Sequence, residues 1–181
     1  MASSYPAWVD DSLMKDYYDH YWGQPTHDEQ WLFEMLSLEL FQAGLTWKTI
    51  WKKRRNFERA FANFDVDQVA AFNDAQIQQL QADKGIIRNR LKIQAVIANA
   101  RVLQDWHRNG QSLNDFLWGY VGGEIRKLHF KSSADLPAND DLSAKISQDL
   151  KKAGFHFVGP TIIFSYLCAV GIYQLQVDQW E

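Results

Sequence analysis

The chain has 181 residues, of which 46 % are hydrophobic and 23 % are charged. This ordinary globular composition excludes a largely disordered chain and predicts one compact domain over residues 1–181. A formal net charge of −3 argues against a protein that holds nucleic acid mainly through bulk positive charge. Aromatic residues make up 14 % of the chain and include eight Trp, more than a core of this size needs.

Membrane and disulfide-rich proteins are also excluded by the sequence. No apolar stretch approaches the ~20 residues that span a bilayer, and the N-terminus lacks the basic-then-apolar pattern of a secretion signal. The single cysteine, Cys168, cannot form an internal disulfide or a cysteine-rich metal site. We therefore expect a cytoplasmic protein that does not associate with membranes.

Apolar residues recur at helical spacing in the first half of the chain. Thr26 and Glu29 form a capping-box pair ahead of an apolar run that stops at Gly44. Thr46 is placed to cap the next helix, which is predicted to extend to Phe61. The other face of that helix is strongly basic and carries Lys48, Lys52, Lys53, Arg54 and Arg55.

The second half of the chain continues the helical pattern. Asn73 and Gln76 predict the start of a short helix, and a longer helix begins near Leu91 and stops at Gly110. A further short helix is expected around Phe116. Residues 124–141 predict a surface loop, and no segment alternates cleanly enough to predict a strand. The expected fold class is therefore all-α, a compact helical bundle.

The last two predicted helices form a closely connected pair over residues 142–170. Gly154 ends the first of them, and Pro160 stands at the first position of the second, directly after Gly159. Free backbone N–H groups and the helix dipole at such a start bind an anion without side-chain charge. The sequence therefore allows a phosphate site here, although spacing alone favours an ordinary helix corner.

Five segments match, in order and at suitable distances, the characteristic sequence blocks of one enzyme family: residues 17–25, 32–47, 84–90, 115–118 and 154–166. On these segments the chain is identified as a member of the DNA-3-methyladenine glycosylase I family, within the helix-hairpin-helix glycosylases. The resemblance implies a helix-hairpin-helix element at about 142–170 and a pocket between helical lobes.

The resemblance also implies an activity in base excision repair. A monofunctional glycosylase would hydrolyse the N-glycosidic bond of 3-methyladenine in alkylated double-stranded DNA and leave an abasic site. No Lys is evidently poised to form a Schiff base, no cofactor is expected, and a monomer without protein partners is favoured. Two alternatives stay open: a non-catalytic helix-hairpin-helix protein that recognises alkylated bases, and a helical protein that binds a small molecule.

Glu39 is the candidate catalytic residue. It lies mid-helix among apolar residues, where a carboxylate is costly unless it has a partner. The residues alone slightly favour a structural pairing with a backbone amide or a neighbouring Arg. The resemblance favours an acceptor for donor groups on the adenine edge, which argues against a protein that has lost catalysis.

Four aromatic residues are the candidate base-binding set. An adenine alkylated on its ring is a cation while attached to the sugar, and electron-rich ring faces attract it. Tyr17, Trp22 and Trp47 fall where the family places pocket aromatics, with Trp8 as a fourth. Each alone would predict core packing, but as a matched set around Glu39 they predict a base-binding pocket.

Further positions are assigned to the pocket edge and to DNA. Ser165 is expected to border the pocket, with a buried Ser bonded to its own helix as an equal alternative. Gly44 and Leu45 are placed to enter the gap left by an extruded nucleotide, with a core Leu at a helix break as the alternative. Gly159 and Thr161 are assigned to phosphate binding.

The sequence departs from its family at the zinc site that joins the two termini of typical members. Tyr18 stands at the position of a His ligand, and neither residues 4–8 nor residues 174–181 contain Cys or His. We therefore expect no metal. Packing by Tyr5, Tyr18 or Trp180 is one way to replace that clamp.

Two other positions bear on the chemistry. Related enzymes often carry an essential Asp beyond the hairpin, but Asp178 lies near the chain end, where a catalytic group is poorly held. A cationic purine is already a good leaving group, so extrusion, stacking and one carboxylate can suffice. Met14 stands where the family often has another aromatic residue, which predicts a change in the pocket wall.

Overall fold

The computed structural model describes residues 4–181. Its α-helices in chain order are α1 (Ser12–His20), α2 (Glu29–Gln42), α3 (Trp47–Lys52), α4 (Arg54–Ala60), α5 (Val66–Ala70), α6 (Asp74–Ala82), α7 (Arg90–Arg108), α8 (Leu113–Gly119), α9 (Asp141–Ala153) and α10 (Pro160–Ala169). The remaining elements are the 3-10 helices η1 (Ala62–Phe64) and η2 (Ser133–Asp135) and the strands β1 (Arg126–Ser132) and β2 (Tyr173–Gln179). None of the helices within residues 4–181 combines the length and apolar character that a bilayer span requires.

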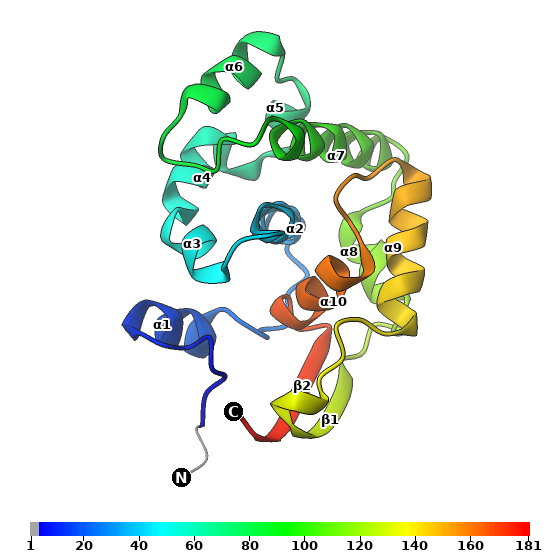
Figure 1. The fold of residues 1–181 in the computed structure, drawn as a ribbon. Coiled ribbons are helices and arrows are strands. Elements are labelled where there is room, and N and C mark those ends of the chain that lie inside the picture. Colours follow the sequence, from blue (N-terminus) through cyan, green and yellow to red (C-terminus); the bar gives the residue numbers. More distant parts are fainter. Residues whose placement is uncertain (1–3) are drawn as a thin grey trace.

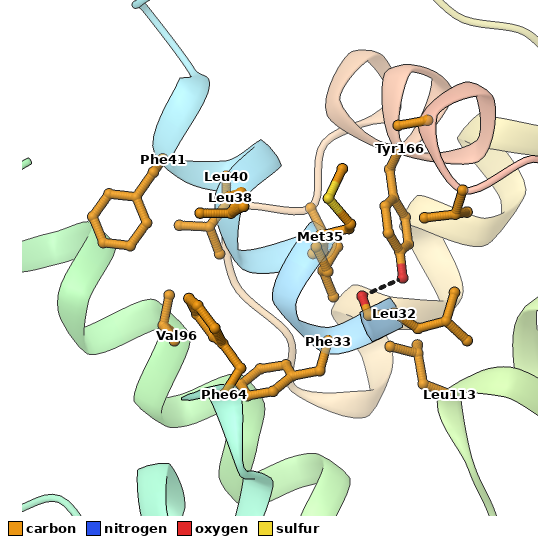
Figure 2. Close-up of a cluster of buried hydrophobic side chains, with 14 of the residues drawn as sticks. Leu32, Phe33, Met35, Leu38, Leu40, Phe41, Phe64, Val96, Leu113 and Tyr166 are labelled. Carbon is orange, nitrogen blue, oxygen red and sulfur yellow. Dashed lines mark hydrogen bonds between the residues drawn. The ribbon is translucent and has the colours of Figure 1, made fainter. Parts of the chain in front are cut away.

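Helix α2 lies at the centre of the fold, surrounded by other helices (Figure 1). Every residue from Leu32 to Phe41 is buried, and all of them except Glu34, Ser37 and Glu39 are apolar, so α2 buries all its faces. Each fully buried Leu or Phe side chain stabilises the fold by about 1.5–3 kcal/mol. On the α10 side, the Tyr166 hydroxyl donates a hydrogen bond of 2.6 Å to the Leu32 carbonyl (Figure 2).

The start of α2 differs from the sequence prediction. The N-cap is Asp28, whose carboxylate accepts a backbone N–H of the first turn, so the predicted pair of Thr26 and Glu29 is wrong. Glu29 instead accepts the backbone N–H groups of Leu113 and Asn114, at 2.6 and 2.9 Å. Glu29 thus stabilises the start of α8. The local sequence around Glu29 cannot reveal this partner, which lies more than 80 residues away in the chain.

Most other predicted helix ends are confirmed. Thr46 caps α3, and Asn73 with Gln76 forms a capping box at the start of α6. Gly154 ends α9 in the left-handed conformation with φ 103°, which glycine adopts without strain. The helix expected to continue to Phe61 is instead interrupted at Lys53, where α3 ends and α4 begins.

A small sheet corrects the expectation that the fold has no strands. The predicted loop 124–141 contains β1. This strand pairs in parallel with β2 near the C-terminus, in a register from Arg126↔Tyr173 to Ser132↔Gln179. Most residues of both strands are at least partly exposed, so neither shows a strong apolar pattern. Parallel partners also lie far apart in sequence, with α9 and α10 between them.

The predicted basic face is also corrected, because Arg54 is not on the surface. Its side chain is 13 % exposed, and its Nε donates a hydrogen bond of 3.3 Å to Glu34 and forms an ion pair with Glu58 at 2.9 Å. Its guanidinium lies 4.7–5.1 Å from the ring centres of Tyr21, Trp31 and Trp51. This cation is therefore bound within the protein and unavailable to DNA.

Candidate active site

A cavity of about 450 Å³ opens between the N-terminal segment, α1, α2, α3, α10 and β2. Such a concave, largely apolar site with a few polar groups is typical of small-molecule recognition. All six predicted catalytic and base-binding residues line it, namely Glu39, Trp8, Tyr17, Trp22, Trp47 and Ser165. The tertiary structure thus brings together positions that are spread over most of the chain.

Glu39 is the one carboxylate among the lining residues that the structure describes. It is 5 % exposed, and no group among residues 4–181 donates a hydrogen bond to it. The structure of residues 4–181 thus shows no pairing of Glu39 with an amide or Arg. Burial raises the pKa of this carboxyl from 4.5 to about 8. A cation entering the cavity would compensate the buried charge.

The aromatic residues form the walls of the cavity from its floor to its rim. The ring centre of Tyr17, which is fully buried, lies 5.3 Å from that of Trp47 and 5.9 Å from that of Trp8. Trp8 meets Trp22 in a T-shaped contact at 6.0 Å and stays partly exposed. The buried Trp47 Nε1 has no hydrogen-bond partner within residues 4–181, so this donor is available to a bound molecule.

A second aromatic layer supports this rim from outside. Tyr18 stacks on Trp22 with ring centres 5.1 Å apart and contacts Trp8 at 5.7 Å. Tyr5 meets Tyr18 edge-on at 5.4 Å. In the described part of the chain, no three His, Cys, Asp or Glu side chains gather in a way that could hold a metal ion. Tyr5, Tyr18, Trp22 and Trp8 thus form one continuous aromatic cluster beside the cavity.

Sequence reasoning missed five lining residues: Gln42, Thr46, Phe164, Cys168 and Leu175. Gln42 follows Glu39, and Cys168 follows Ser165, by three residues on the same helix. Helical spacing could therefore have identified these two, whereas nothing local points to Leu175 on β2. Burial raises the pKa of the Cys168 thiol, which keeps it protonated.

One expectation about the cavity wall is corrected, and an alternative for a second residue is excluded. Met14 is fully buried in the core and does not line the cavity, so a change of the wall at this position is wrong. Ser165 is exposed toward the cavity and makes no hydrogen bond to its own helix, which rules out the buried alternative. Asp178 pairs with His129 at 2.8 Å and lies outside the cavity lining.

The turn after α2 projects from the protein surface. Gly44 has φ 80°, a conformation that other residues adopt only with strain. The side chain of Leu45 is 38 % exposed, so the alternative of a core Leu is wrong. Gln42 fixes the turn through two hydrogen bonds of 2.7 Å. Its side-chain Nε2 donates to the Leu45 carbonyl, and its backbone carbonyl accepts the Leu45 N–H.

The connector between α9 and α10 leaves the start of α10 open. Gly159 is the N-cap and supplies no side chain, and Pro160 has no N–H, so the next backbone amides are free of a side-chain cap. Gly159 has an ordinary φ of −61°, and a Cβ added there would meet no atom within 4 Å. Folding therefore does not require glycine here. Binding of a ligand by the amides would require it, because a side chain at this position would block the approach. Thr161 is exposed and accepts a hydrogen bond from Asn139.

Comparison with known proteins agrees with this geometry. A family model described as methyladenine glycosylase matches residues 8–179. The chain is 42 % identical over 166 residues to DNA-3-methyladenine glycosylase 1 of Escherichia coli K12, covering 91 % of this chain and 89 % of that one.

Solved structures of such enzymes have the same fold. A crystal structure of 3-methyladenine DNA glycosylase I aligns with a TM-score of 0.91 at 38 % identity, covering 96 % of this chain and 94 % of that one. The Staphylococcus aureus enzyme, solved to explain 3-methyladenine recognition, aligns at 0.88 and 37 %, covering 91 % and 88 %. The expected helical glycosylase fold is thereby confirmed, and the chain belongs to the methyladenine glycosylase family.

Proposed function

We propose that this chain is a DNA repair enzyme that hydrolyses the bond between 3-methyladenine and deoxyribose in double-stranded DNA and leaves an abasic site. The observation that carries the proposal is Glu39, a buried carboxylate without a partner in an aromatic cavity. The relatives cited are named as 3-methyladenine glycosylases, which supports the same reaction.

The cavity suits a base that has left the DNA stack. The alkylated base carries a positive charge while it is bonded to the sugar, and the rings of Tyr17, Trp22 and Trp47 attract such a cation. The approaching cation lowers the pKa of Glu39, so that the carboxylate ionises beside the base. Charge and stacking then select the alkylated adenine over a neutral one.

The reaction needs no general acid. When the N-glycosidic bond breaks, its electron pair moves to the cationic base, which leaves as a neutral molecule. Water adds to C1′ of the sugar, and its proton passes to solvent. Glu39 would stabilise the positive charge along this path, which is why an Asp beyond the hairpin is dispensable. Since no Lys lines the described cavity, we propose hydrolysis without strand cleavage.

DNA would be held at two places outside the cavity. The free amides behind Gly159 and Thr161 bind one phosphate through geometry more than net charge, which fits an acidic protein. The exposed Leu45, carried by Gly44, fills the space that the extruded nucleotide leaves. We further propose that residues 1–181 act as a single domain and that the protein is a cytoplasmic monomer. Light scattering would check the monomer by its molecular mass.

Release of free base from DNA tests the proposal. Purified protein is incubated with duplex DNA treated with a methylating agent, and the released bases are separated by chromatography. We expect free 3-methyladenine and intact strands that alkali then cleaves at abasic sites. Tight binding of alkylated DNA without base release would instead support a non-catalytic binding protein.

A further inference from the structure

Helix α7 carries two buried polar side chains that the proposed chemistry does not use. Lys92 is 6 % exposed and Asn99 is 1 % exposed. They are seven residues apart, so they lie on the same face of the helix, about 10 Å from each other along its axis. Buried polar groups are costly unless they are paired, so their partners indicate what they are for.

Lys92 is bound to the end of α2. Its Nζ donates hydrogen bonds of 2.8 Å to the Phe41 carbonyl and 2.6 Å to the Ala43 carbonyl. Such carbonyls at a helix C-terminus have no partner within the helix and mark its negative end, which a cation stabilises. No carboxylate among residues 4–181 pairs with Lys92, so the end of α2 alone compensates this charge. The Gly44–Leu45 turn follows directly.

Asn99 is bound to the hairpin connector. Its Nδ2 donates to the His156 carbonyl at 3.2 Å, and its Oδ1 accepts the His156 N–H at 2.8 Å. This reciprocal pair fixes the backbone midway between Gly154 and Gly159. Figure 1 shows α7 passing beside both the end of α2 and this connector.

Neither of these turns is held by deep packing of its own tip. Leu45 and Phe157 are each 38 % exposed, and Phe157 has a positive φ of 56°. Exposed turns with such backbones open at low cost in free energy unless they are tied to a stable element. The hydrogen bonds from the buried face of α7 add such a tie to the Gln42 hydrogen bonds at Leu45 and to the burial of Phe155 and Val158 in the connector.

We propose that α7 sets the distance between the Leu45 turn and the hairpin, with Lys92 and Asn99 as positioning residues. The two turns then act together on the DNA around one extruded nucleotide. This inference rests on the proposed function of both turns in DNA binding. It predicts that loss of either side chain slows base release from DNA. Recognition of the free base should be unaffected, because no residue of α7 lines the cavity.

The test uses Lys92→Met and Asn99→Leu, which keep the volume and remove the hydrogen bonds. Arg101→Met is the matched control, because Arg101 on α7 also donates to two carbonyls, those of Ala70 and Phe72. A misplacement of about 1 Å can cost ~100-fold in rate, so we expect kcat/KM for base release from DNA to fall by roughly 10- to 100-fold in both variants. Affinity for free 3-methyladenine, measured by Trp fluorescence, should stay within about twofold, and the control should keep both values.

Two further variants separate positioning from a general loss of structure. Lys92→Arg keeps donors for both carbonyls and should recover most of the rate. Leu45→Ala combined with Lys92→Met should be no slower than Leu45→Ala alone, since Lys92 acts through this turn. Additive losses, or a parallel fall in free-base affinity, would overturn the proposal.

Affinity for duplex DNA containing an abasic-site analogue is measured in parallel by fluorescence anisotropy. This readout does not depend on base release. If the wild-type protein released no base, the proposed function would fail while weaker DNA binding by Lys92→Met still supported the positioning role. Unchanged DNA binding and base release in that variant would contradict the positioning role alone.

Discussion

The aromatic cavity and the helix hairpin are built in different ways. The cavity takes side chains from the N-terminal segment, four helices and a strand, so its residues range from Trp8 to Leu175. The hairpin is a continuous segment between α9 and α10 that presents backbone amides. A site made of side chains depends on their identity and on the whole fold, whereas one made of amides depends mainly on local backbone geometry. Substitutions should therefore separate the two regions.

The largest effect is expected from Gly159→Phe, because the new side chain would cover the free amides of α10. The position has room for it and an ordinary φ, so the protein should fold. Base release from DNA should be lost, falling at least ~100-fold, while affinity for free 3-methyladenine stays unchanged. Gly119→Phe at the open end of α8 is the matched control. If base release and free-base affinity were lost together, the hairpin would be part of the core and not a separate phosphate site.

Glu39→Gln should affect the cavity in the opposite way, by weakening recognition of the base itself. The amide is nearly isosteric but loses the charge and presents a donor. A hydrogen bond to a charged group contributes about 1.5–3 kcal/mol, so kcat/KM for release of the cationic base should fall roughly 10- to 150-fold, and affinity for the neutral free base should fall by a smaller factor. Glu34→Gln is the control, since Glu34 is buried on the same helix but pairs with Arg54 outside the cavity. Unchanged free-base affinity in Glu39→Gln would indicate that Glu39 has a structural role and does not bind the base.

The pH dependence of stability should reveal the same carboxyl. Its pKa of about 8 in the folded protein lies above its ordinary value of 4.5, so the unfolded chain binds fewer protons in between. The free energy of unfolding should therefore fall as pH rises through this window, by up to about 1.4 kcal/mol per pH unit. Urea unfolding at several pH values should show this fall in the wild type and a smaller one in Glu39→Gln. Parallel curves would show that Glu39 does not titrate as its burial implies.

A smaller effect is expected at the cavity rim. Tyr18→Ala removes the ring that stacks on Trp22 and contacts Trp8. An aromatic pair contributes about 0.5–1.5 kcal/mol, so free-base affinity should fall about 2- to 10-fold. Tyr18→Phe keeps the ring and should bind like the wild type. Equal losses in both variants would point to the hydroxyl instead of the ring contacts.

Chelation should have the smallest effect of all. The resemblance implies a zinc ligand at the position of Tyr18, and residues 4–8 and 174–181 contain no Cys or His. We therefore expect EDTA to leave the thermal unfolding midpoint unchanged. Elemental analysis should find no stoichiometric zinc in the purified protein. One zinc ion per chain would contradict both the prediction and the matching of the termini to the family.

The sequence by itself determined the features that depend on neighbouring residues. Gly154 and Pro160 end and begin the hairpin helices, and Thr46 caps α3, because each acts within one or two turns of its own position. The family resemblance added Glu39 and the aromatic set, although the geometry of their cavity was not predictable from local pattern.

Only the tertiary structure decided the features that join distant segments. The parallel pairing of β1 with β2, the Glu29 carboxylate at the start of α8, and the burial of Arg54 each involve partners on other elements. The same holds for Lys92 and Asn99, whose partners are backbone groups of α2 and of the hairpin connector. A backbone carbonyl or N–H has the same chemistry at every residue, so the sequence does not mark which one a buried side chain will bind.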